Sequence, residues 1–217
     1  MTASRVDGLV IDSDERVGDG GFLAVRRLRL RNARGDGSLS PPYVCDVIVR
    51  PFGQDAVVVA IYARVAGEIR VLVRQCLRPA IALGRDAAKA PLPEAQPELF
   101  QTELVAGIVE VGDQLADRAA DEVHEEAGFA VAASAVTVLG AGMLPSPGCM
   151  VEKFYFTAVE VDPATQQALV GDGSPMEEGA TTRWLALDDA IAACVRGEIP
   201  DLKTELGLRR LRDHLAG

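Results

Sequence analysis

The chain has 217 residues, of which 48% are hydrophobic and 25% are charged, and its formal net charge is -10 at pH 7. These values are typical of a globular protein, and the length allows one domain of ordinary size or a compact domain with a smaller appendage. The acidic balance argues against a nucleic-acid surface, which needs dense Lys and Arg clusters. It does not exclude a small phosphate-bearing molecule, because a metal ion can neutralise the phosphate charge.

The four cysteines, Cys45, Cys76, Cys149 and Cys194, lack C-x-x-C spacing and indicate neither a zinc site nor a small disulfide scaffold. The first residues lack the apolar region of a signal peptide, and charged residues interrupt the most apolar stretch, 56–73. We therefore expect a reduced, cytoplasmic protein without a membrane span.

Residues 1–21 are polar and rich in Gly and Asp, so we expect them to be loosely ordered apart from one short strand at 9–11. Apolar residues then alternate with arginines from Phe22 onward, and the stretch up to Val49 predicts the two strands of a hairpin. Residues 1–50 are accordingly expected to form a small β subdomain, with the main domain at 51–217. A hairpin of this size must pack on the rest of the chain or on a partner chain.

Two mainly apolar runs follow, at 56–62 and 69–73, joined by a turn at 66–68. Strands of this kind are buried on both faces, which predicts a central sheet with helices on both sides. Arg74 and Arg78 come just after the second run, where arginines bind phosphate or simply face solvent. The Ala- and Pro-rich stretch 81–96 reads as a long loop, either a functional lid or a disordered segment.

The most informative stretch is a helix expected from Gln114, with apolar residues at every fourth position from Leu115 to Ala127 and a stop at Gly128. Its last turns carry three carboxylates that lie roughly 5 to 6 Å apart on such a helix, those of Glu122, Glu125 and Glu126. The negative end of the helix dipole disfavours anions there. A hard divalent cation such as Mg²⁺ or Mn²⁺ would turn the repulsion into attraction, whereas the plainer interpretation is a solvated acidic face.

The remaining elements are expected to be three strands and two helices. The strands are 136–139, 153–161 and 181–187, and the helices are 188–196, capped by an aspartate, and 201–215, interrupted at Gly207.

At residues 107–129 the sequence resembles a Nudix box. The matching positions are Gly107, Glu122, Val123, Glu125, Glu126, Gly128 and Phe129. Two positions depart from the family pattern, since Asp113 stands in place of Glu and Asp121 in place of Arg. The flanking segments resemble ADP-ribose pyrophosphatases: Glu103 to Gly107 with Glu110, Ser146 to Gly148 with Glu152, and Ile199 to Thr204 with Asp201, Lys203 and Thr204.

The resemblance implies an α+β fold, a Nudix-type α/β/α sandwich with a mixed central sheet and a small N-terminal β subdomain. It also implies a site in which Mg²⁺ (or Mn²⁺) is held by Glu122, Glu125, Glu126 and the backbone carbonyl of Ala106. An acidic residue of a late loop would serve as base or metal contact, with Glu178 favoured over Glu177 by its distance from Trp184.

Three further residues receive roles, the two arginines from their place after a strand and Glu152 from the same resemblance. Arg74 and Arg78 would bind substrate, and Glu152 would hold a metal-bound water or the ribose, or only brace its own loop. In the family the box arginine and the first glutamate of the box support each other and so hold the loop-helix-loop in shape, and both are changed here. We expect Arg118 to replace this support, because it lies three residues before Asp121 and four before Glu122 on the same helix.

The function implied is Mg²⁺-dependent hydrolysis of a nucleoside diphosphate sugar to a nucleoside monophosphate and a sugar phosphate. ADP-ribose is the first expectation, followed by GDP-mannose and other nucleotide sugars. The alternative is a non-catalytic nucleotide-binding or sensor protein with a degenerate box. The N-terminal β subdomain resembles the dimerisation domain of related pyrophosphatases, so a homodimer is expected, without nucleic-acid or membrane partners.

Overall fold

The computed structural model describes residues 6–18, 21–50, 53–171 and 173–217. The chain divides into two compact units. The first comprises Met1–Asp55 and Leu144–Lys153, and the second comprises Ala56–Met143 and Phe154–Gly217. Within the described ranges, no helix combines the length and the hydropathy needed to cross a membrane.

The first unit contains an antiparallel sheet in the order β1-β2-β3. Its strands are β1 (Val6–Val17), β2 (Ala24–Arg34) and β3 (Tyr43–Val49). The predicted hairpin corresponds to β2 and β3. The expectation of a loosely ordered start is wrong for residues 6–17, which pair with residues 25–34 of β2, while residues 1–5 and 19–20 lie outside the described residues.

Ion pairs explain why β1 is hard to recognise in the sequence. Arg31 binds Asp12 at 2.8 Å, and Arg26 binds Asp14, so this strand is joined to its neighbour partly through polar side chains. A strand with many polar residues lacks the apolar alternation from which strands are predicted. The segment Leu144–Lys153 also belongs to this unit, where the amide of Ile48 donates to the carbonyl of Cys149 at 2.7 Å.

The second unit is built on a mixed sheet in the order β10-β5-β4-β9-β8, with β6 added to β5 and β7 to β4. Its strands are β4 (Asp55–Val65), β5 (Glu68–Leu77), β6 (Phe100–Glu103), β7 (Val105–Val109), β8 (Thr137–Val138), β9 (Phe154–Glu160) and β10 (Thr181–Ala186). The pairing of β4 with β9 is parallel, whereas that of β4 with β5 is antiparallel.

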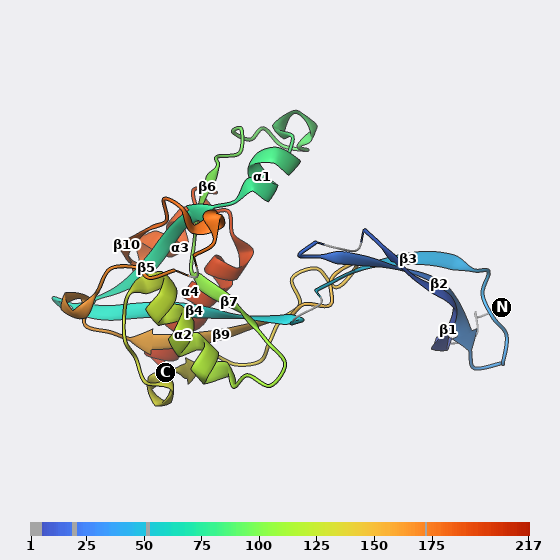
Figure 1. Ribbon diagram of the computed structural model, residues 1–217, viewed down its shortest axis with the longest axis horizontal. Helices are drawn as coiled ribbons and strands as arrows, with labels where there is room; N and C mark the ends of the chain where they lie inside the picture. The colour runs from blue at the N-terminus through green and yellow to red at the C-terminus, as the bar shows by residue number, and fades with distance from the viewer. Residues whose placement is uncertain (1–5, 19–20, 51–52, 172) are drawn as a thin grey trace. The chain divides into compact units, whose positions relative to one another are not determined.

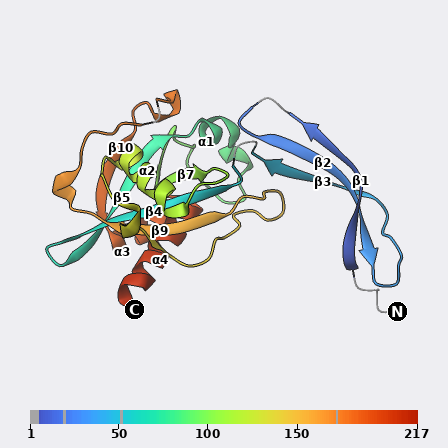
Figure 2. The same cartoon turned by 60° about the horizontal axis from the view of Figure 1, so that its bottom comes forward.

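Helices cover both faces of this sheet, as Figures 1 and 2 show. They are α1 (Pro79–Gly84), α2 (Leu115–Ala127), α3 (Leu187–Val195) and α4 (Leu202–Ala216), with 3-10 turns at Ala87–Lys89, Ala133–Ala135, Pro163–Thr165 and Pro175–Glu177. Strand β4 shows how the core is divided. Val57, Val59 and Ile61 pack with α2, whereas Val58 and Ala60 pack with α3 and α4. The predicted sheet with helices on both sides is thereby confirmed, and the fold is α+β.

Three local expectations differ from the structure. The stretch 81–96 is not only a loop, because it contains most of α1 and a 3-10 turn. Helix α3 begins without the expected aspartate cap, whereas Asp201 caps α4 by accepting from the amide of Thr204 at 3.0 Å. Helix α4 continues through Gly207, where a Cβ atom would lie 2.7 Å from Leu104, so the glycine serves close packing rather than a break.

Candidate active site

The acidic helix α2 follows β7 after a short turn. The carboxylate of Asp113 accepts from the amide of Glu110 at 2.9 Å and holds this turn. At the other end, Gly128 has a φ of 74°, and its amide donates to His124 at 3.1 Å, which closes the helix where the sequence predicts. Ala119, Val123 and Ala127 of α2 are fully buried against the sheet, and Leu115 is partly buried beside them. This packing fixes the direction in which the glutamates of the helix point.

Glu122 is only 4% exposed and packs against Gly107 of β7. A Cβ atom on Gly107 would lie 1.5 Å from Oε1 of Glu122, so a side chain at this position would displace the carboxylate. Arg118 donates to Glu122 and, at 3.1 Å, to the carbonyl of Ile108, and it lies 3.8 Å from Glu125. Arg118 therefore occupies the supporting position expected from its spacing.

Glu126 faces the sheet beside Arg74. Arg74 donates through one terminal nitrogen to Glu126 and through the other to Glu177, the latter at 2.7 Å. The amide of Ala106 donates weakly to Glu126 at 3.4 Å, so Ala106 lies next to this carboxylate. Strand β5 extends to Leu77, and Arg74 is therefore a buried residue within the strand rather than a residue just beyond it.

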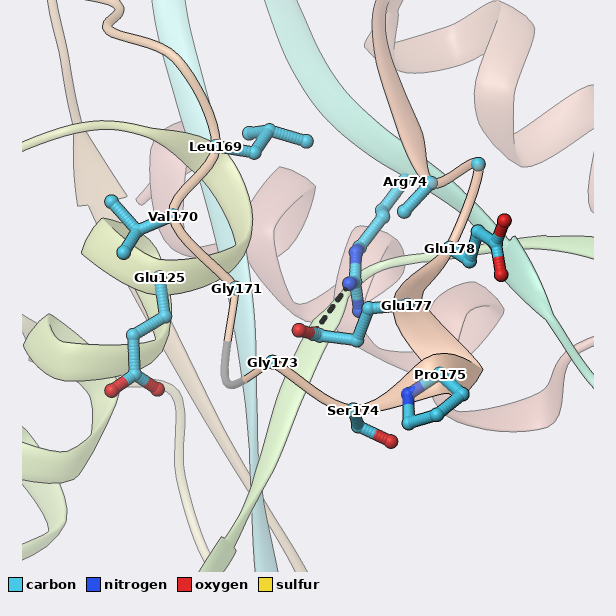
Figure 3. Close-up of a pocket in the computed structure, with 12 residues that line it drawn as sticks. Arg74, Glu125, Leu169, Val170, Gly171, Gly173, Ser174, Pro175, Glu177 and Glu178 are labelled. Carbon is cyan, nitrogen blue, oxygen red and sulfur yellow. Dashed lines mark hydrogen bonds and ion pairs between the residues drawn. The ribbon is translucent and has the colours of Figure 1, made fainter.

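The late loop brings Glu177, rather than Glu178, toward the helix. Figure 3 shows the carboxylate of Glu177 beside Arg74, while that of Glu178 is directed away from Arg74 and Glu125. Glu178 is exposed and Glu177 is half-buried. Both line a cavity of about 480 Å³ together with Arg74 and Glu125. By position, Glu177 is thus a better candidate than Glu178 for contact with the helix, although the sequence favours Glu178.

Arg78 belongs to a neighbouring cluster of charges around Glu103. Glu103 is 4% exposed and accepts from both Arg78 and Lys203, and Lys203 also pairs with Asp201 at 3.0 Å. Burial by itself would raise the pKa of Glu103, but the positive charges of Lys203 and Arg78 outweigh it and lower that pKa. Sequence spacing does not indicate this cluster, whose members come from separate segments and line a second cavity of about 770 Å³.

Glu152 lies in the first unit, where it is 6% exposed and pairs with Arg50. The guanidinium of Arg50 also lies over the ring of Phe22, 5.5 Å from its centroid. These contacts agree with a loop-bracing role for Glu152, one of the three roles expected for it. Its role in substrate or metal binding stays a prediction.

Glu122 and Glu126 are poorly stabilised as anions by the protein alone. Burial raises the pKa of Glu122 to about 7 and that of Glu126 to about 8, although Arg118 and Arg74 oppose the rise. One arginine per carboxylate therefore does not compensate fully for the loss of hydration. A hard cation would supply the missing charge, and the oxygen-only set of Glu122, Glu125, Glu126 and the Ala106 carbonyl has the donor chemistry that Mg²⁺ prefers. The residues thus fit such an ion in chemistry.

The geometry does not present them as a ready metal cluster. Among the described residues, no group of three or more His, Cys, Asp or Glu side chains lies close enough together to hold a metal ion. The salt bridges explain why, since Arg118 and Arg74 each hold one of the buried glutamates. Metal binding would require these side chains to rearrange.

Among solved structures, the crystal structure of an ADP compounds hydrolase is similar to this chain, with a TM-score of 0.71 and 15% sequence identity over 99% of this chain and 98% of that chain. No protein-family model matches the sequence, and no curated protein matches it. At this identity the similarity shows the fold alone. It confirms the α+β architecture of a mixed central sheet with a small antiparallel three-stranded sheet.

Proposed function

We propose that this chain is a Nudix-type hydrolase that splits the diphosphate of a nucleoside diphosphate sugar with the help of Mg²⁺ or Mn²⁺. The observation that carries the proposal is the burial of Glu122 and Glu126, two carboxylates on one helix face, each with a raised pKa and a single arginine partner. The fold shared with a protein named as an ADP compounds hydrolase supports it.

The metal would be held by Glu122, Glu125, Glu126 and the backbone carbonyl of Ala106. When bound, such an ion neutralises the diphosphate and lowers the pKa of a coordinated water, so that hydroxide is available near neutral pH. Glu122 and Glu126 are positioned for this by their packing against β5 and β7. Arg118 donates to Oε1 of Glu122 and is itself anchored on the carbonyl of Ile108. Arg118→Ala is therefore expected to weaken metal binding sharply, because the loss of this fixed orientation of Glu122 outweighs the loss of a repulsive charge.

The other charged residues would act on substrate and water. Arg74 and Arg78 supply guanidinium groups that bind phosphate oxygens in pairs. Glu177, or Glu178 after a movement of its loop, would accept a proton from the attacking water. The preferred substrate in this proposal is ADP-ribose, which would give AMP and ribose 5-phosphate, with GDP-mannose and other nucleotide sugars next.

The alternative function is a nucleotide-binding or sensor protein without turnover. It is favoured by one observation, namely that arginines already occupy both buried glutamates. The departures at Asp113 and Asp121 point the same way. Retention of all three helix glutamates favours hydrolysis, because a binder has no need of them.

A homodimer is part of the proposal. The first unit has only three strands, and several of its large apolar side chains are exposed, including Ile11, Phe22 and Val44. Burial of such side chains against a second copy would stabilise association. A molar mass of a single chain in light scattering would contradict the dimer.

The cytoplasmic location agrees with four cysteines that form no disulfide and stays a prediction.

The decisive experiment is incubation of the chain with Mg²⁺ or Mn²⁺ and a panel of nucleotide sugars, with chromatographic analysis of products. A nucleoside monophosphate that appears only with added metal supports hydrolysis. Glu126→Gln should abolish this turnover and leave the fold intact, whereas the control Glu205→Gln, which removes a carboxylate from α4, should retain it. Binding of a nucleotide sugar without any product would instead support the sensor.

A further inference from the structure

Arg74 joins two parts of the candidate site that are far apart in the sequence. Its guanidinium binds Glu126 of α2, 52 residues away, and Glu177 of the late loop, 103 residues away. The three side chains are 5%, 13% and 18% exposed, respectively, so the contacts are shielded from water. Within the described residues, Nε of Arg74 is buried without a hydrogen-bond partner. The arginine is therefore committed to these two carboxylates through its terminal nitrogens.

The position of Glu177 is fixed from the other side by Gly171. A Cβ atom on Gly171 would lie 2.5 Å from Oε2 of Glu177. The amide of Gly171 donates to the carbonyl of Glu125 at 2.9 Å, which attaches this part of the chain to the end of α2. Glu177 is thus held between a backbone segment seated on α2 and the guanidinium of Arg74 (Figure 3).

We propose that Arg74 is an internal counter-ion that holds Glu126 and Glu177 together and competes with a divalent cation for them. This inference rests on the proposed function, because it assumes that the helix glutamates receive a cation. A carboxylate oxygen that accepts from a guanidinium faces a positive charge, and a cation approaching Glu126 would be repelled by it in these shielded surroundings. Arg74 must therefore leave Glu126 when the cation enters.

The replacement of Arg74 by the cation at Glu126 has two consequences for the site. The bond between Arg74 and Glu177 no longer restrains residues 173–180 to the same degree, because the arginine moves. The released guanidinium also becomes available as a paired donor for an anion such as a diphosphate. Cation binding would then precede anion binding, and Arg74 would set that order as a positioning residue.

The first test measures the affinity for Mn²⁺ alone, by electron paramagnetic resonance on the full chain. Removal of the charge in Arg74→Gln should tighten Mn²⁺ binding about tenfold, since a repulsive charge near the site is lost. Arg74→Lys, which keeps the charge, should bind Mn²⁺ as the unaltered chain does. The control Arg209→Gln, which removes an arginine from a pair on α4, should have no effect. A purely structural role of Arg74 predicts the opposite result, weaker binding in Arg74→Gln.

The second test needs no metal. Amide hydrogen exchange of residues 173–180 should be faster in Arg74→Gln than in the unaltered chain. The same increase is expected in Glu177→Gln, which keeps the arginine and replaces Arg74→Gln in this test if that variant does not fold. Unchanged exchange in the foldable variant would overturn the inference. So would Mn²⁺ binding in Arg74→Gln that is equal to or weaker than in the unaltered chain, a result that leaves the proposed hydrolase intact. If neither the unaltered chain nor any variant binds Mn²⁺, both the counter-ion role of Arg74 and the proposed metal-dependent hydrolase are refuted.

Discussion

The contact between Gly107 and Glu122 allows one prediction to be worked out in detail. Gly107 is not among the glycines with a positive φ, so alanine meets no backbone strain there, and the whole effect of Gly107→Ala comes from overlap. The new Cβ atom would lie 1.5 Å from Oε1 of Glu122, which must then move away from Arg118. Overpacking of a buried position costs about 1–3 kcal/mol. At about 2–4 °C per kcal/mol for a chain of this size, Tm should fall by about 2–12 °C.

The fluorescence of Trp184 is a suitable signal for this unfolding. It is the sole tryptophan of the sequence, and its ring packs edge-on against Phe129, at 6.2 Å between centroids, in the core beneath α2. The matched control is Gly84→Ala, in which the new Cβ atom meets nothing within 4 Å. It should change the stability by less than about 0.5 kcal/mol. Equal Tm values for Gly107→Ala and the control would refute the packing of Glu122 on Gly107.

Three further outcomes follow from buried polar groups. Thr204→Val leaves the amide of Leu104, which donates to the Thr204 hydroxyl at 2.8 Å, without an acceptor, and should cost about 1–3 kcal/mol in chemical denaturation. The pKa of Glu103 is lowered by Lys203, so its ionised carboxylate should stabilise the fold fully above its unfolded pKa of about 4.3. This contribution is lost as the pH falls through the folded pKa. The difference in Tm between the unaltered chain and Glu103→Gln should therefore be largest near neutral pH and vanish in acid. Burial raises the pKa of Cys76 to about 12, so this thiol should react with a disulfide reagent at pH 8 only after unfolding, as peptide mapping would show.

The parts of the fold that the sequence predicts well are those that obey a single packing rule. Strand β4 contains the continuous apolar run 56–62 and β5 the shorter run 71–73, and helices bury both faces of these runs. Helix α2 has one buried face and a glycine at its end, and both features appear in the sequence as spacing. Helix α1 is missed because it has six residues and none of them is buried, so no apolar pattern marks it.

In the candidate site, contacts between residues close in the sequence can be predicted from spacing, whereas contacts between distant residues cannot. The support of Glu122 by Arg118 is a contact between residues four apart on a helix, which spacing alone predicts. The choice between Glu177 and Glu178 depends on the direction of two adjacent side chains in a loop, which spacing does not determine. The pairing of Arg74 with Glu126 depends on where α2 crosses the sheet, and no sequence pattern encodes a contact over 52 residues.

The two departures from the box pattern are compensated close to where they occur. Asp121 is exposed and points away from the buried face of α2, so its added charge is screened by water and disturbs Glu122 little. Arg118, three residues before Asp121 on the same helix, donates to Glu122, and its bond to the carbonyl of Ile108 also ties α2 to β7. Asp113 closes the turn before the helix through the amide of Glu110. The altered positions therefore keep the strand, turn and helix in register, and the burial of the glutamates does not depend on the missing arginine.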